Sequence, residues 1–156
     1  MFNQIKHKKK GTNDSWNTPK KAWLDIAHLL SQDKVLLEPF FNETSNSHVY
    51  LEEMGFKVMQ NDLWDILPFF DRVVTNPPFS LMRPTLSRLF ELDASFIIIA
   101  PLSILVRQYF KDYRELVSIL IPPKRIQFEQ DGAEARSPFD VIYLVYPCLN
   151  EKLIYL

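Results

Sequence analysis

The segment Asn76-Pro77-Pro78-Phe79 combines residue types that can hold an aromatic amine. The side-chain oxygen of Asn76 and the backbone carbonyl of Pro77 are hydrogen-bond acceptors, and an amino group such as that of adenine has two N–H groups to donate. Consecutive prolines restrict the backbone, so these oxygens are held in position. Phe79 offers a flat apolar face, and stacking a base on such a ring contributes about 1–3 kcal/mol. The segment predicts a site for a planar amine.

An amine on an aromatic ring is a poor nucleophile because its lone pair is delocalised into the ring. Acceptors on both N–H groups help the nitrogen to become pyramidal and to attack an electrophile such as a methyl sulfonium. This in-line displacement needs no covalent enzyme nucleophile, and the sequence shows no Cys–His or Ser–His arrangement that would supply one. A pair of prolines can also simply end a strand. The position directly after the apolar run at 73–75 favours an active site.

The elements around this segment follow an α/β pattern. Near-continuous apolar strands that alternate with helices predict a Rossmann-like fold, a single twisted, mostly parallel sheet with helices on both faces. Ligands of such sheets bind beyond the carboxyl ends of the strands, where the strand order reverses. We therefore expect the loops after Leu37 and Thr75 to form the site. The predicted strands are residues 35–37, 56–59, 72–75, 96–100, 116–121 and 141–146, and the predicted helices are 19–30, 49–54, 84–90 and 105–110.

Local signals define the ends of two of these helices. Thr18 is a favourable N-cap residue and Pro19 suits the first helical position, so the first helix should begin there. Gly55 suits the C-terminal cap of the second helix, because glycine accepts the left-handed backbone that such caps use.

Residues 70–81, FDRVVTNPPFSL, resemble the catalytic motif of adenine-specific DNA methyltransferases, and are most similar to the EcoRI-type and small phage or viral adenine methyltransferase-like families. The resemblance implies a class I methyltransferase fold with S-adenosylmethionine as the methyl donor. It also implies that the motif's asparagine and first proline bind the target amine while its aromatic residue stacks on the base. By this resemblance the catalytic residues are Asn76, Pro77, Pro78 and Phe79, with Ser80 beside them on the substrate side.

The same families imply a cofactor site after the first strand. Their loop there is usually rich in glycine, whereas this chain has only three glycines and none follows Leu37. Residues 38–45 resemble a variant loop of phage-type relatives, and residues 16–19 resemble the segment that covers the methionine moiety. An acidic residue after the second strand would contact the adenine or ribose of the cofactor, and Asp65 competes with Asp62 for this role. The implied cofactor-binding residues are Trp16, Thr18, Pro19, Glu38, Pro39, Phe40, Ser45 and Asp62.

Residues 124–128, followed by Ser137-Pro138-Phe139, resemble the C-terminal segment of phage adenine methyltransferases. Arg125 is a candidate substrate-binding residue there, because its guanidinium can grip two phosphate oxygens. Ile126 and Phe128 are alternate residues of a possible strand, on which Arg125 would only be exposed.

The composition suits one folded domain. The chain has 156 residues, 47% of them apolar, and a net charge of −1, so any attraction for nucleic acid must be local. We expect a basic, polar tail at 1–15 and a single methyltransferase-like domain at 16–156, without a separate target-recognition domain. The run KHKKK at 6–10 is either solvated or contacts phosphate. Cys148 is the only cysteine, which fits a reducing intracellular compartment such as the cytoplasm. The sequence predicts neither a metal site nor a membrane span.

Several functions agree with these features. Methylation of the N6 amine of adenine in DNA is favoured, on a base that is single-stranded or flipped from the duplex. RNA is the alternative, and the sequence does not separate it from DNA, because no residue is identified that would read a ribose hydroxyl. Methylation of a protein glutamine amide ranks lower, because that related motif usually has tyrosine where this chain has Phe79. The glycine-free loop leaves open an inactive scaffold that binds nucleic acid or a partner. A second subunit could supply target recognition.

Overall fold

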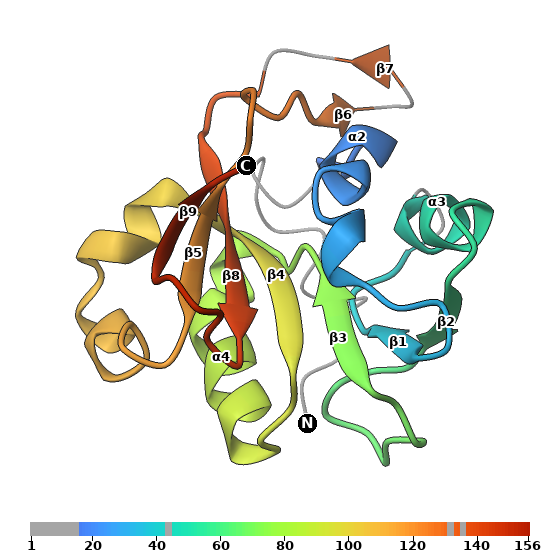
Figure 1. The fold of residues 1–156 in the computed structure, drawn as a ribbon, viewed down its shortest axis with the longest axis horizontal. Coiled ribbons are helices and arrows are strands. Elements are labelled where there is room, and N and C mark those ends of the chain that lie inside the picture. The colour runs from blue at the N-terminus through green and yellow to red at the C-terminus, as the bar shows by residue number, and fades with distance from the viewer. Residues whose placement is uncertain (1–15, 43–44, 131–132, 135–136) are drawn as a thin grey trace.

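A seven-stranded sheet with the order β2-β1-β3-β4-β8-β5-β9 forms the centre of the molecule (Figure 1). The computed structural model describes residues 16–42, 45–130, 133–134 and 137–156, and the predicted basic run at 6–10 lies outside the described residues. The strands of the sheet are β1 (Val35–Glu38), β2 (Lys57–Gln60), β3 (Arg72–Thr75), β4 (Phe96–Pro101), β5 (Ser118–Ile121), β8 (Val141–Tyr146) and β9 (Leu153–Tyr155).

The strand order reverses at β1. Strand β1 pairs in parallel with β2 on one side and with β3 on the other, and β3 pairs in parallel with β4. Strand β8 runs antiparallel between β4 and β5, and β9 is parallel to β5. The predicted Rossmann-like, mostly parallel sheet is confirmed. The gap between the carboxyl ends of β1 and β3 is therefore the topological switch point, where ligands of such sheets bind.

The core lies in two layers, one on each face of the sheet. Alternate residues of a strand point to opposite faces, and β4 is buried at five of its six positions. Its Ile97 and Ile99 pack with Trp23 of α2 (Lys20–Leu24), whereas Ile98 packs with Leu86 of α4 (Met82–Glu91). Figure 1 shows these two helices on opposite sides of the sheet.

Two helix starts differ from the prediction. Helix α2 has Pro19 as its N-cap and no side-chain cap, because the hydroxyl of Thr18 accepts a hydrogen bond from Asn76 instead. Helix α4 begins at Met82, two residues before Pro84, because the 3₁₀ turn η3 (Phe79–Leu81) leads directly into it. After α2, a second 3₁₀ turn, η2 (Ala27–Leu29), replaces the predicted continuous helix.

The end of the second helix is as predicted. Helix α3 (Ser47–Glu53) is followed by Gly55 with φ of +95°, a backbone conformation that favours glycine.

The predicted helix at 105–110 is wrong. Two 3₁₀ turns, η4 (Leu102–Val106) and η5 (Gln108–Asp112), are separated by Arg107 in an extended conformation. Ile104 and Phe110 are both buried in the same core. In one continuous α-helix these two side chains would point about a third of a turn apart, so the break in the backbone lets both of them reach the core.

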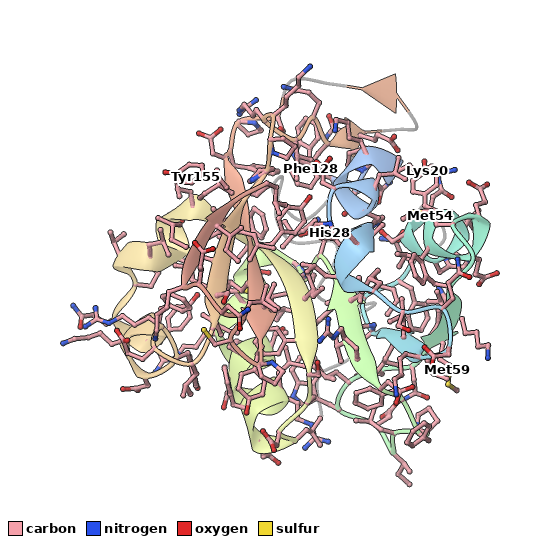
Figure 2. All side chains as sticks on the ribbon, viewed as in Figure 1. Lys20, His28, Met54, Met59, Phe128 and Tyr155 are labelled. Carbon is pink, nitrogen blue, oxygen red and sulfur yellow. The ribbon has the colours of Figure 1, made fainter. Side chains whose placement is uncertain are left out.

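The segment before β8 also departs from the sequence pattern. Ile126 and Phe128 are buried, but residues 124–128 form no strand. The hairpin β6 (Glu129–Gln130) and β7 (Ala133–Glu134) follows them as a separate two-stranded sheet. Strand β9 was not predicted from the sequence and adds an outer edge. Met59 and Tyr155, on the two edge strands, lie at opposite margins of the molecule (Figure 2). None of the helices in the described ranges is long and apolar enough to cross a membrane.

Candidate active site

A pocket opens at the switch point between the carboxyl ends of β1 and β3. Its empty volume is about 510 Å³, a value that includes the solvent in its open mouth. The residues that line it come from both predicted loops and from two more distant segments: Trp16, Asn17, Thr18, Glu38, Phe40, Asn42, Ser45, Ser47, Asn76, Pro77, Pro78, Phe79 and Phe139.

Glu38, the last residue of β1, connects the two strand ends at the base of the pocket. Its side chain is only 1% exposed. Its Oε1 accepts a hydrogen bond of 2.7 Å from the backbone N–H of Phe40 and one of 2.5 Å from the hydroxyl of Thr75, the last residue of β3. These bonds compensate the burial of a carboxylate. The glycine-free loop is thereby held against β3.

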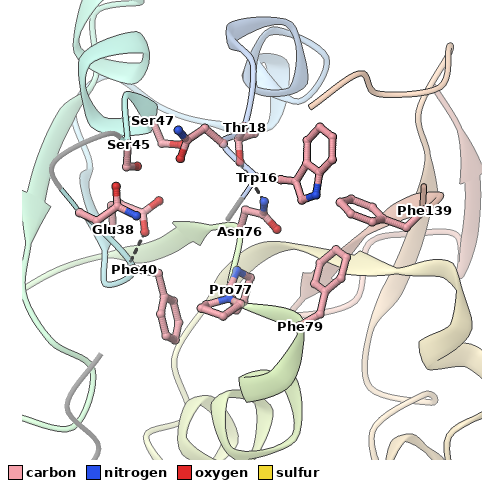
Figure 3. Close-up of a pocket in the computed structure, with 13 residues that line it drawn as sticks. Trp16, Thr18, Glu38, Phe40, Ser45, Ser47, Asn76, Pro77, Phe79 and Phe139 are labelled. Carbon is pink, nitrogen blue, oxygen red and sulfur yellow. Dashed lines mark hydrogen bonds between the residues drawn. The ribbon is translucent and has the colours of Figure 1, made fainter. Parts of the chain in front are cut away.

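Asn76 follows β3 directly and lies at the centre of the pocket (Figure 3). Its Nδ2 donates a hydrogen bond of 3.0 Å to the Thr18 hydroxyl. Its Oδ1 is buried and has no hydrogen-bond partner within the described part of the chain. A buried acceptor without a partner costs about 1–3 kcal/mol, so such atoms are rare unless a ligand satisfies them. The orientation of the amide thus leaves one acceptor available inside the pocket.

The two prolines set the path of the chain after Asn76. Both Pro77 and Pro78 are buried, and the Pro78 carbonyl accepts a 2.8 Å hydrogen bond from the backbone N–H of Leu81. This bond closes the turn η3 and turns the chain into α4. Phe79 stands at the start of that turn and lines the pocket.

An aromatic wall, formed by Trp16, Phe79 and Phe139, lies beside the open oxygen of Asn76 (Figure 3). The ring of Phe139 contacts Phe79 at a centroid distance of 5.1 Å and Trp16 at 6.0 Å, both edge to face. Phe128, fully buried, supports Phe139 from behind at 5.2 Å. A pocket wall built from three rings suits a planar ligand.

The opposite side of the pocket is more polar. Figure 3 shows Glu38, Ser45 and Ser47 on this side of Asn76, with Phe40 below them. The Ser47 hydroxyl accepts a 3.1 Å hydrogen bond from the Trp23 indole N–H, which ties α3 to α2. The pocket therefore has a polar half and an aromatic half, and Asn76 stands between them.

The structure brings most of the predicted site residues together. Five of the predicted cofactor-binding residues and the whole Asn-Pro-Pro-Phe segment line the pocket. Asp62 does not, because its Oδ1 accepts a 2.9 Å hydrogen bond from the backbone N–H of Trp64 in a local turn, and Asp65 is exposed. The other predicted residues outside the lining are Pro19, Pro39, Ser80 and Arg125.

Arg125 forms its hydrogen bonds with other residues of the protein, at positions 137–140. Its guanidinium donates hydrogen bonds of 2.6 Å to Asp140, 2.7 Å to the Ser137 carbonyl and 3.1 Å to the Phe139 carbonyl. These acceptors occupy the Nε and one terminal nitrogen that a phosphate would use. The observed contacts favour a role in positioning the segment that carries Phe139.

Four lining residues were not predicted: Asn17, Asn42, Ser47 and Phe139. Asn17 and Asn42 lie within the motifs at 16–19 and 38–45, and Ser47 lies two residues after the second motif. Phe139 comes from the segment before β8, 60 positions after Phe79. The resemblance of residues 137–139 to the C-terminal segment of phage adenine methyltransferases implied no role for Phe139 in the site.

No protein-family model matches the chain, and no curated protein matches it. Solved structures do. PH1948 of Pyrococcus horikoshii, assigned as an RNA methyltransferase, superposes with a TM-score of 0.51 at 18% identity, over 79% of each chain. A dimethyladenosine transferase from Plasmodium falciparum gives a TM-score of 0.46 at 11% identity, over 82% of this chain and 62% of that one. Together with the sheet order, the first likeness shows that the chain has the Rossmann-like class I methyltransferase fold.

Proposed function

We propose that the chain is an S-adenosylmethionine-dependent methyltransferase that acts on the exocyclic N6 amine of adenine in a nucleic acid. The observation that carries the proposal is the buried, unpartnered Oδ1 of Asn76 beside an aromatic wall. An acceptor next to an aromatic wall is the arrangement that an aromatic amine requires, since the amine donates while its ring stacks. The position at the switch point of a methyltransferase fold adds support.

The polar half of the pocket suits the cofactor. S-adenosylmethionine, when bound, supplies a methyl group on a positively charged sulfur. Glu38 places a negative charge in this half, which favours a cationic ligand. Without glycine the backbone cannot approach a ligand as closely. Contacts would therefore come from the side chains that line this half, namely Phe40, Asn42, Ser45 and Ser47.

The aromatic half would hold the target base. Asn76 Oδ1 accepts a hydrogen bond from one N–H of the amine, and the Pro77 carbonyl accepts from the other. These two acceptors draw the nitrogen out of conjugation with the ring, which exposes its lone pair to the methyl donor. Thr18 keeps the Asn76 amide in the required orientation. The wall of Trp16, Phe79 and Phe139 supports the base.

The nucleic acid could be RNA or DNA. The sequence motif favoured DNA, whereas the structural neighbour from Pyrococcus horikoshii is assigned as an RNA methyltransferase. RNA is supported at least as well as DNA, so both belong in the first assay. In either case the target base must be single-stranded or flipped, because its amine is inaccessible in a stacked duplex.

The test offers labelled cofactor with single-stranded DNA, RNA and protein pools, and looks for N6-methyladenine by nucleoside mass spectrometry. We expect Asn76→Ala to lower turnover by at least about 100-fold, as loss of a transition-state hydrogen bond does. Its cofactor affinity should stay close to that of the unmodified protein. Ser87→Ala, at an exposed position of α4, is the matched control and should be fully active.

Three outcomes would count against the proposal. Undiminished turnover in Asn76→Ala would show that Asn76 is not the acceptor on which catalysis depends. If calorimetry shows no binding of S-adenosylmethionine at millimolar concentration, the protein is instead a scaffold without transferase activity. A methylated glutamine in place of methylated adenine would identify a protein substrate.

A further inference from the structure

A cationic surface adjoins the aromatic wall of the pocket. Arg83 belongs to the first turn of α4, four residues after Phe79, and its guanidinium carbon lies 5.8 Å from the ring centroid of Tyr109 in η5. Arg107, between η4 and η5, precedes Tyr109 by two residues. Burial raises the pKa of Tyr109, and the charges of Arg107 and Arg83 oppose that rise.

These two arginines differ from most of the other cations that the structure describes. Neither forms an ion pair or a hydrogen bond with any described residue, and both are exposed. The cations that do pair with a carboxylate are Lys20, Lys21, Arg88, Arg114, Arg125 and Lys152. Lys111 of η5 is exposed as well, and Asp112 is the acidic residue of that turn.

The surface is connected to the pocket through the backbone. The N–H of Leu102, the first residue of η4, donates a 2.9 Å hydrogen bond to the carbonyl of Asp140, next to Phe139 of the aromatic wall. On the other side, η3 joins Phe79 directly to α4. The start of α4 and the turn η4 therefore adjoin the segments that carry Phe79 and Phe139.

We infer that Arg83 and Arg107 bind the phosphodiester backbone of the single-stranded substrate beside Tyr109, next to the flipped adenine. This rests on the proposed function. A guanidinium presents parallel N–H donors that match two phosphate oxygens, and an aromatic ring beside such cations can stack on a neighbouring base. The chain as a whole carries a net charge of −1, so attraction for a polyanion requires a local surface of this kind.

The experiment measures the affinity for a short fluorescent oligonucleotide by anisotropy, over a series of salt concentrations. The same nucleotide sequence is tested as DNA and as RNA, and the tighter complex shows which of the two nucleic acids the protein prefers. The variants are Arg83→Ala, Arg107→Ala, the double variant and Arg83→Lys. Lys57→Ala, an exposed cation on β2 at the far edge of the sheet, is the matched control.

We expect each alanine variant to weaken binding and the double variant to weaken it about tenfold or more at low salt. The slope of log affinity against log salt should fall by about 0.7 for each phosphate contact removed from a single strand. Arg83→Lys should keep the slope, because it keeps the charge, and Lys57→Ala should match the unmodified protein. Cofactor affinity should be unchanged in every variant.

An unchanged affinity and slope in the double variant would overturn the inference, as would an equal loss in Lys57→Ala or an unmodified protein that binds neither oligonucleotide. The two proposals fail separately. If the protein methylates adenine but the arginine variants bind normally, this surface alone is wrong. If the protein methylates nothing but its oligonucleotide binding depends on both arginines, the binding surface is supported and the proposed methyltransferase activity is wrong.

Discussion

Thr18 and Asn76 form the smallest unit of the site. The Thr18 side chain is 5% exposed, and its hydroxyl accepts the Asn76 Nδ2 hydrogen bond at 3.0 Å. Because an amide has a donor end and an acceptor end, satisfying the nitrogen with Thr18 directs the oxygen to the aromatic half. Thr18 is thus a positioning residue that acts through Asn76.

Thr18→Val tests this role with a side chain of the same shape. The amide would lose its partner and rotate, so we expect kcat to fall about tenfold, or about 1.4 kcal/mol in activation free energy. The free energy of unfolding should fall by about 1 kcal/mol, as is usual for a lost hydrogen bond. Thr18→Ser keeps the hydroxyl and should restore kcat. Equal activity of the valine and serine variants would show that Thr18 does not orient Asn76.

Glu38 is the other residue on which the site depends. Its Oε1 already accepts from Phe40 and Thr75, and glutamine would keep one such oxygen while removing the charge. We expect Glu38→Gln to fold and to bind S-adenosylmethionine at least about tenfold more weakly, a loss of about 1.4 kcal/mol. Calorimetric titration measures this directly. An unchanged dissociation constant would mean that the charge of Glu38 plays no part in the cofactor site.

At the scale of elements, helix α2 connects the site to the core, because it contacts both the sheet and α3. The Tyr143 hydroxyl on β8 donates a 2.6 Å hydrogen bond to the Ala22 carbonyl, and burial raises the pKa of that tyrosine so that it keeps its proton. Trp23 binds Ser47 of α3 from the same helix. Trp16 and Thr18, just before α2, are therefore held by contacts to both the sheet and α3.

The turn between α3 and β2 gives a prediction about element ends. Gly55 has φ of +95°, and a Cβ there would lie 2.8 Å from the Gln32 amide nitrogen. We expect Gly55→Ala to lower the free energy of unfolding by about 1–3 kcal/mol, the usual cost of a strained backbone conformation. Urea denaturation measures the change. Adding Gln32→Ala should recover only part of it, because the contact is relieved and the backbone strain remains; full recovery would assign the whole effect to the contact.

For the whole molecule, the pocket exists only where distant segments meet at the switch point, so a ligand there should stabilise the fold as a unit. At a concentration about 100 times its dissociation constant, S-adenosylmethionine should raise the free energy of unfolding by about 2.7 kcal/mol. Thermal denaturation with and without the cofactor measures this. Asn76→Ala should show the same rise, since its lost contact is to the base. A cofactor that binds but leaves Tm unchanged would have to bind the unfolded chain equally well.

Much of this fold could be predicted because the strands carry their own signal. Strands covered on both faces are largely apolar, and both the parallel strand at 72–75 and the antiparallel strand at 141–146 were located to the residue. Element ends and turns were less predictable, because they depend on tertiary partners. Thr18 looks like a helix cap in the sequence, but Asn76 uses its hydroxyl. The segment at 105–110 has apolar residues at helical spacing, but Ile104 and Phe110 are buried together only if the chain bends.

The sequence by itself determined the acceptor chemistry of Asn76 and Pro77 and the two loops expected at the switch point. Residue type and the succession of strands and helices along the chain are properties of the sequence alone. Only the tertiary structure decided which oxygen remains without a partner, that Phe139 completes the aromatic wall, and that Arg125 holds this segment. Those features depend on contacts between residues far apart in sequence, such as Asn76 with Thr18, and no local pattern records which distant side chain will satisfy a buried polar group.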